Sequence, residues 1–204
     1  MSESDSAYEA RMKALKEQQD AASRARTRRG GLLLVHTGDG KGKTTAAIGM
    51  AIRALGWGHR VGFVQFIKGR WKTGEQKLLA SLDGLDHVIS GKGFSWETQD
   101  RAVDRAAARA GWEAACAMID ASRGEEPRYR LVVLDELCVA LALEQLPVDE
   151  VVDTLAALPP KLSVVVTGRG APEALLAIAD TVTSMEPVKH AYQAGVPAQK
   201  GIDY

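Results

Sequence analysis

A glycine-rich loop between a strand-like run and a helical pattern carries the residues best suited to chemistry in this chain. The loop, Thr37 to Thr45, reads TGDGKGKTT and follows the apolar residues 32–35. Glycines let successive backbone N–H groups turn inward around an anion, and a helix N-terminus adds partial positive charge. Lys43 would reach the outer phosphates of a nucleotide, and the Thr44 hydroxyl would bind Mg²⁺. The strand–loop–helix context therefore predicts a phosphate-binding loop.

One position departs from the usual phosphate-loop pattern. That pattern has a glycine five residues before Gly42, where this chain has Thr37. The alternative interpretation is a glycine-rich turn that binds no ligand. The complete context favours phosphate binding. The predicted nucleotide contacts are Gly38, Asp39, Gly40, Lys41, Gly42, Lys43, Thr44 and Thr45.

An acidic pair follows a buried strand later in the chain. Asp135 and Glu136 come directly after the apolar residues 131–134, which is the Walker B arrangement. A carboxylate at the end of such a strand holds the Mg²⁺ that bridges nucleotide phosphates. The alternative is an acidic N-cap for a helix that starts near Leu137. Together with the phosphate loop, the pair predicts a metal site.

Two further motifs leave their roles open. Arg169, between Gly168 and Gly170, could place its guanidinium on phosphate oxygens, or it could be a surface arginine in a turn. Phe94 and Trp96 lie in a glycine-punctuated loop. Large aromatic side chains in such a loop either fill the core of the domain or form an apolar wall for a flat ligand. Their spacing alone favours the core.

Apolar strands alternate with helical patterns along the rest of the chain. Fully apolar strands in this alternation predict an α/β fold with a parallel sheet covered on both faces. Ligands bind such sheets at the carboxyl ends of the strands, so the phosphate loop, the acidic pair and Arg169 should converge. Further strands are predicted at 60–67, 87–90, 131–134, 162–167 and 181–185, with helices at 44–55, 75–82 and 99–121, on both sides of Pro147, and from Pro172. One side of the predicted helix 99–121 carries Val103, Ala107, Ala110, Ala114 and Met118.

Residues 1–30 differ from the predicted domain at 31–204. Good helix formers run from Tyr8 to Arg26, and Ser6 with Glu9 makes a candidate capping box. The apolar stripe of this helix is narrow and consists of Tyr8, Met12 and Leu15. Such a helix is either solvated or docks on another surface. The arginines that mark the linker into the domain are Arg24, Arg26, Arg28 and Arg29.

The composition is that of an ordinary globular protein. Of 204 residues, 46% are hydrophobic and 25% charged, and 26 basic residues balance 26 acidic ones. This charge balance offers no basic footprint for nucleic acid. No apolar run is long enough to span a membrane, and no signal peptide is recognisable. We expect a cytoplasmic protein with Cys116 and Cys138 as reduced thiols and no metal-ligand spacing among its four histidines.

The glycine-rich loop, including the threonine at its first position, resembles the phosphate loop of the corrinoid adenosyltransferases of the cobalamin pathway. Further motifs extend the resemblance over nearly the whole chain. They are VQFIKG at 64–69, GFSWETQ at 93–99, LDE at 134–136, TGRG at 167–170, PVKH at 187–190 and GIDY at 201–204.

The resemblance implies a RecA-like P-loop fold, a homodimer, and transfer of the adenosyl group of ATP to a corrinoid. The nucleophile would be Co(I), attacking the ribose C5′ with triphosphate as leaving group. Catalysis would then depend on positioning and on charge stabilisation of the triphosphate. The residues implied in catalysis are Lys41, Lys43 and Arg169, and those implied around Mg²⁺ or Mn²⁺ are Thr44, Asp135 and Glu136.

The resemblance also implies roles for the two segments that composition leaves open. Phe94 and Trp96 would cover the lower face of the corrin and exclude its axial ligand, which makes Co(II) easier to reduce. The N-terminal helix would fold over the corrinoid site, that of the dimer partner, and a flavodoxin-like protein would supply electrons. Two rival functions are an ATP-hydrolysing motor or switch and a corrinoid carrier with a degenerate ATP site. Intact Lys43 and Asp135 argue against the carrier.

Overall fold

The computed structural model describes residues 3–26, 30–67, 73–90 and 100–203. The chain divides into two compact units, Met1–Gly30 and Gly31–Tyr204. In the first unit a single helix, α1, runs from Asp5 to Arg24. Its N-cap is Ser4, whose side-chain oxygen accepts a hydrogen bond from the Ala7 N–H at 3.4 Å. The predicted capping box at Ser6 is therefore wrong: Ser6 lies inside the first turn, because the earlier serine already caps the helix.

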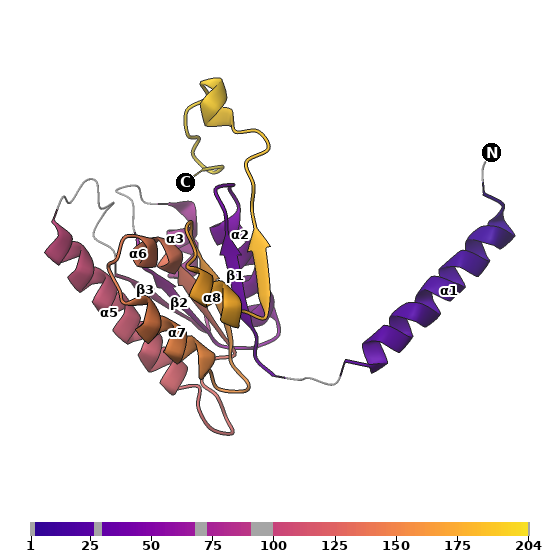
Figure 1. Cartoon of the computed structure of the whole chain (residues 1–204), viewed down its shortest axis with the longest axis horizontal. Helices are drawn as coiled ribbons and strands as arrows, with labels where there is room; N and C mark the ends of the chain where they lie inside the picture. The colour runs from indigo at the N-terminus through magenta and orange to yellow at the C-terminus, as the bar shows by residue number, and fades with distance from the viewer. Residues whose placement is uncertain (1–2, 27–29, 68–72, 91–99, 204) are drawn as a thin grey trace. The chain divides into compact units, whose positions relative to one another are not determined.

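The second unit is built on one six-stranded parallel sheet (Figure 1). The strand order is β3-β2-β4-β5-β1-β6. The strands are β1 (Leu33–Thr37), β2 (Val61–Gln65), β3 (Leu85–Ile89), β4 (Leu131–Asp135), β5 (Ser163–Thr167) and β6 (Thr181–Ser184). The predicted α/β fold with a parallel sheet is confirmed, and it is consistent with a RecA-like P-loop architecture.

Helices cover both faces of the sheet. One core joins α5, α6, α7 and α8 to one face of the strands, with Val132 and Leu134 pointing into it. A second core joins α2 and α3 to the opposite face, where Leu131 and Val133 point. This alternation explains why the strands read as continuous apolar runs. The helices are α2 (Lys43–Gly56), α3 (Gly74–Leu79), α5 (Arg101–Asp120), α6 (Leu137–Ala142), α7 (Val148–Ala156) and α8 (Glu173–Ile178).

The buried face of α5 differs from the side described in the sequence analysis and shares only Met118 with it. Val103 is 37% exposed, and Ala110 is also exposed. Trp112 anchors the helix instead: its ring is buried, and its indole N–H donates to the Glu150 carboxylate at 2.9 Å. In an alanine-rich helix several stripes are similarly apolar, so the single large side chain determines which one turns inward. The buried residues are Ala108, Gly111, Trp112, Ala115, Met118 and Ile119.

The strand β6 forms an exposed edge of the sheet, and the chain continues from it into the C-terminal segment. All four residues of β6 are exposed. After β6 the chain forms one 3₁₀ turn, η1 (Ala191–Ala194), and then a turn over residues 199–203. Both cysteines are free thiols, Cys116 in α5 and Cys138 in α6. Across the described helices, none has the length and hydrophobicity that a membrane crossing needs.

Candidate active site

The phosphate loop leads from the carboxyl end of β1 into α2. Gly42 caps α2 with a φ of 109°, a left-handed conformation that favours glycine. Lys43 is the first residue of the helix, and its Nζ donates to the carbonyl oxygens of Gly38 at 2.7 Å and Gly40 at 2.6 Å. Burial lowers the pKa of Lys43, and the charge of Arg169 lowers it further. The lysine thus lies folded over the centre of the loop, with its ammonium group bonded to loop carbonyl groups.

The outer side of the loop rests on the end of β6. The Gly40 N–H donates to the Met185 carbonyl oxygen at 2.7 Å. A Cβ added at Gly38 or at Gly40 would lie 2.4 or 2.7 Å from that same oxygen. Close backbone packing therefore requires both glycines, and Gly38 also has a φ of 89°, a conformation that favours glycine.

Lys41, at the tip of the loop, forms an ion pair with Asp203. The other Asp203 carboxylate oxygen accepts a hydrogen bond from the Gln199 N–H at 2.8 Å, so the acid belongs to an ordered turn. The Lys41 ammonium holds the pKa of Asp203 below its ordinary value. Sequence reasoning gave Asp203 no role, although it lies in one of the motifs that carried the resemblance.

The Asp135 carboxylate lies under the loop, at the carboxyl end of β4. Its Oδ1 accepts from the hydroxyls of Thr44 at 2.9 Å and Thr167 at 2.7 Å, and its Oδ2 accepts from the Gln65 amide at 3.1 Å. Burial raises the pKa of Asp135, and the three donors oppose that rise. A carboxylate and a threonine hydroxyl at bonding distance are hard oxygen donors of the kind Mg²⁺ prefers. These residues fit the predicted metal site.

Glu136 occupies a strained position beside this carboxylate. Its φ of 61° lies in the left-handed region, which few residues other than glycine adopt. Its N–H donates to the Thr167 hydroxyl at 2.9 Å. Burial and the neighbouring Asp135 raise the pKa of Glu136 to about 7, against the lowering effect of Lys43 and Arg169. The second predicted metal ligand is therefore a buried carboxyl group whose pKa responds to the charges of Asp135, Lys43 and Arg169.

Arg169 joins the loop from the carboxyl end of β5. Its guanidinium donates to the Asp39 carbonyl oxygen at 3.2 Å, and its Nε lies 3.6 Å from the Asp39 carboxylate. The side chain is exposed, as expected for a turn, but it borders the phosphate loop. Three strand ends, those of β1, β4 and β5, thus bring the predicted site residues together. The roles of these residues stay predictions.

Comparison with known proteins identifies the relatives of this chain. Residues 29–204 match the family described as ATP:corrinoid adenosyltransferase BtuR/CobO/CobP. The chain belongs to this family. Corrinoid adenosyltransferase CobA of Salmonella typhimurium is 45% identical over 201 residues, covering 98% of this chain and 100% of that protein. The corrinoid adenosyltransferase of Escherichia coli K12 has the same identity and coverage. That of Pseudomonas aeruginosa is 47% identical over 175 residues, 85% of this chain and 84% of the relative.

Family membership confirms the resemblance inferred from the motifs. The structure adds three residues that sequence reasoning did not place in the site, namely Gln65, Thr167 and Asp203. Two of them, Gln65 and Thr167, are polar residues that directly follow apolar residues at the carboxyl ends of strands, which is a usable signal in hindsight. Phe94 and Trp96 lie outside the described residues, so the choice between core and ligand wall is not tested by the geometry.

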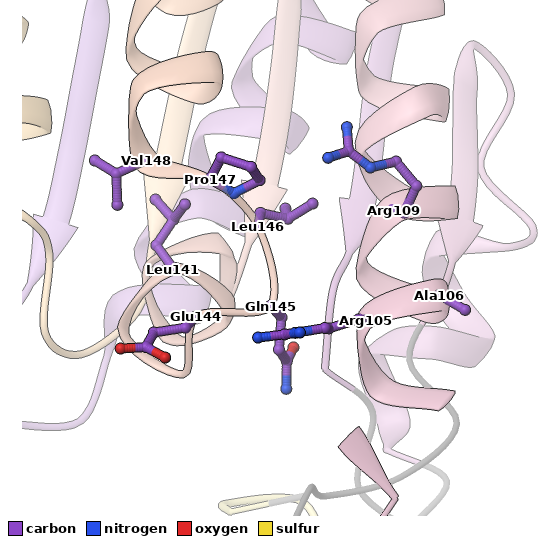
Figure 2. A pocket seen from close by; sticks show the side chains of 9 residues that line it. All are labelled: Arg105, Ala106, Arg109, Leu141, Glu144, Gln145, Leu146, Pro147 and Val148. Atoms are coloured by element: carbon purple, nitrogen blue, oxygen red, sulfur yellow. The ribbon is translucent and has the colours of Figure 1, made fainter. Parts of the chain in front are cut away.

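A separate cavity of about 640 Å³ opens between α5 and the connection from α6 to α7 (Figure 2). Arg105 and Arg109 of α5 form one side, and Leu141, Leu146 and Pro147 form an apolar side. Neither the phosphate loop nor the acidic pair contributes to its lining, so the cavity is not part of the candidate nucleotide site.

Proposed function

We propose that this chain transfers the 5′-deoxyadenosyl group of ATP to the Co(I) of a corrinoid and releases triphosphate, in the biosynthesis or salvage of adenosylcobalamin. The observation that carries the proposal is the bond between Thr44 and Asp135 beneath an intact phosphate loop, in a chain of this family. In the reaction, the Co(I) electron pair forms a bond to C5′. The C5′–O bond breaks, and its electrons leave with the triphosphate, so no protein nucleophile or base is needed.

The residues of the site supply positive charge where the leaving group gains negative charge. Lys43 would exchange its bonds to Gly38 and Gly40 for phosphate oxygens. Lys41, within the loop, and Arg169, which is bonded to Asp39 of the loop, would contact the same triphosphate. Thr44, Asp135 and Glu136 would hold Mg²⁺ or Mn²⁺, with phosphate oxygens completing its shell. When bound, the metal neutralises part of the triphosphate charge.

A hydrolytic ATPase, in which a second acid at the position of Glu136 would activate water, is the alternative function, and the family match does not favour it. The test is to mix the protein with ATP, metal and a chemically reduced corrinoid. We expect a light-sensitive adenosylated corrinoid and intact triphosphate in equal amounts. Release of ADP and phosphate, without an adenosylated product, would reject the proposal.

We also propose that Phe94 and Trp96 cover the lower face of the corrin and assist reduction of Co(II), with electrons from a flavodoxin-like protein. Replacing either residue with alanine should slow the reaction most when the assay starts from Co(II) and a mild protein reductant. With Co(I) prepared chemically, the loss should be much smaller. An equal loss in both assays, together with a lower melting temperature, would favour a role in the core instead.

The N-terminal helix is proposed as a mobile lid over the corrinoid site, contributed by the partner of a homodimer. Each residue of α1, within the described range 3–26, is at least partly exposed, so its stripe of Tyr8, Met12 and Leu15 is available to cover a ligand. Deleting residues 1–26 should leave ATP binding largely intact and weaken corrinoid binding. Amide hydrogen exchange over residues 8–22 should slow when ATP and corrinoid are added. Unchanged exchange would mean that the helix is a solvated tail.

A further inference from the structure

Gln65 is a buried polar side chain that the mechanism above does not use. It is the last residue of β2, a strand whose five residues are all buried, and it is 5% exposed. In the sheet it lies directly beside Asp135, its partner in the register of β2 with β4. Buried polar groups are hydrogen-bonded in native structures, so the hydrogen-bond partners of the Gln65 amide indicate its role.

The amide of Gln65 connects two side chains. Its nitrogen donates to Oδ2 of Asp135 at 3.1 Å, and its oxygen lies 3.0 Å from Nε2 of His87 on β3. An ionised carboxylate only accepts, which places the NH₂ group toward Asp135 and leaves the amide oxygen to accept from the His87 ring N–H. Gln76 of α3 makes a longer contact, 3.5 Å, with the same oxygen. The orientation of the amide is therefore determined at both ends.

The hydrogen bond from Gln65 is important because the two oxygens of the Asp135 carboxylate have different donors. Both threonine hydroxyls bond to Oδ1, whereas the amide of Gln65 bonds to Oδ2. If Thr44 turns its oxygen to a metal ion, Oδ1 keeps only the bond from Thr167. Gln65 and Thr167 then hold one carboxylate oxygen each and fix the plane of the group. Such outer contacts orient metal ligands and tune their affinity.

We infer that Gln65 is a positioning residue that orients the Asp135 carboxylate for the metal–triphosphate complex, with His87 fixing the amide. The inference rests on the proposed metal site. If Gln65 has this role, ATP affinity has two components that respond differently to its loss. The component that depends on metal requires Gln65, whereas the component from Lys43 and the loop backbone does not, because the side-chain hydrogen bonds of Gln65 go to Asp135, His87 and Gln76.

The experiment measures ATP binding by calorimetry in Mn²⁺ and in EDTA, with the electron paramagnetic resonance of Mn²⁺ as a direct count of bound metal. Gln65→Met keeps the length of the side chain and removes the donor. It should weaken ATP binding about 10- to 100-fold in Mn²⁺ and leave binding in EDTA unchanged. Gln65→Asn keeps an amide but shortens the chain, and it should show a smaller loss in Mn²⁺ only. Gln76→Met is the matched control: it removes only the longer 3.5 Å contact to the Gln65 oxygen and keeps the bonds of Gln65 to Asp135 and His87, so it should bind ATP normally in both media.

Asp135→Asn separates failure of the inference from failure of the proposed function. If Asp135→Asn loses Mn²⁺ and Gln65→Met keeps it, the metal site stands and the role of Gln65 is rejected. A Gln65→Met loss that is equal in Mn²⁺ and EDTA rejects it as well, since that pattern indicates a general structural effect. If Asp135→Asn itself binds Mn²⁺–ATP normally, the metal site of the proposed function is wrong. Should Gln65→Met not fold, Gln65→Asn carries the same comparison.

Discussion

Lys43→Ala should lower the rate of adenosyl transfer by at least about a hundredfold, corresponding to at least about 3 kcal/mol of transition-state stabilisation. The Lys43 ammonium is buried at the centre of the loop and is bonded only to loop carbonyls among its described hydrogen-bond partners, so it is preorganised for phosphate. Charge builds up on the triphosphate as the C5′–O bond breaks. Once bound ATP has replaced the Gly38 and Gly40 carbonyls as its partners, the Lys43 ammonium is in place to stabilise that charge as it develops.

The fold should survive this substitution, because the lysine packs against the loop rather than within either core. Its melting temperature should remain close to that of the unchanged protein. Lys77→Ala, which removes an exposed lysine from α3, is the matched control and should keep full activity. Near-normal turnover of Lys43→Ala would mean that the phosphate site has been assigned to the wrong loop.

Asp135→Asn should have a similarly large effect on activity, without a matching loss of stability. Loss of a carboxylate that holds metal should reduce transfer by about 10²- to 10³-fold, the scale of losing one preorganised electrostatic contact. Without metal, the same change should leave stability equal or raise it. Burial raises the pKa of Asp135, so its charged form destabilises the folded state as the pH rises above the ordinary pKa of an aspartate.

The measurement is thermal unfolding in EDTA across pH, alongside the transfer assay. The unchanged protein should lose stability as the pH rises through the raised pKa, whereas Asp135→Asn should lose less over the same range. A strong loss of stability in Asp135→Asn at neutral pH would mean that its hydrogen bonds to Thr44 and Thr167 outweigh the burial of charge.

Much of the fold could be predicted because its signals are local. Each central strand is a short apolar run, since both faces are covered, and the loop glycines mark a turn that the chain cannot make otherwise. The convergence of the loop, Asp135 and Arg169 followed from one rule about parallel sheets. Local signals were weakest in α5, where alanines on several sides left Trp112 to select the buried face.

The contacts missed by sequence reasoning are those that depend on strand order. Gln65 meets Asp135 only because β2 lies next to β4, and nothing near either residue specifies that neighbour. Lys41 and Asp203 are 162 positions apart, and their pairing requires the C-terminal segment to return to the loop. The polarity of such residues was visible in the sequence, but their partners were not.

The position of β1 in the sheet has a consequence for the synthesis of the chain. Although β1 is the first strand to leave the ribosome, both its neighbours come late: it pairs with β5, at Ser163–Thr167, and β6, at Thr181–Ser184. The strands β2, β3 and β4 pair among themselves and can associate earlier. The phosphate loop also lacks one of its hydrogen bonds until Met185 has been synthesised, because the Gly40 N–H donates to the Met185 carbonyl oxygen. A nascent chain that stops before residue 163 therefore has a partial sheet but no nucleotide site, so ATP binding reports that folding is complete.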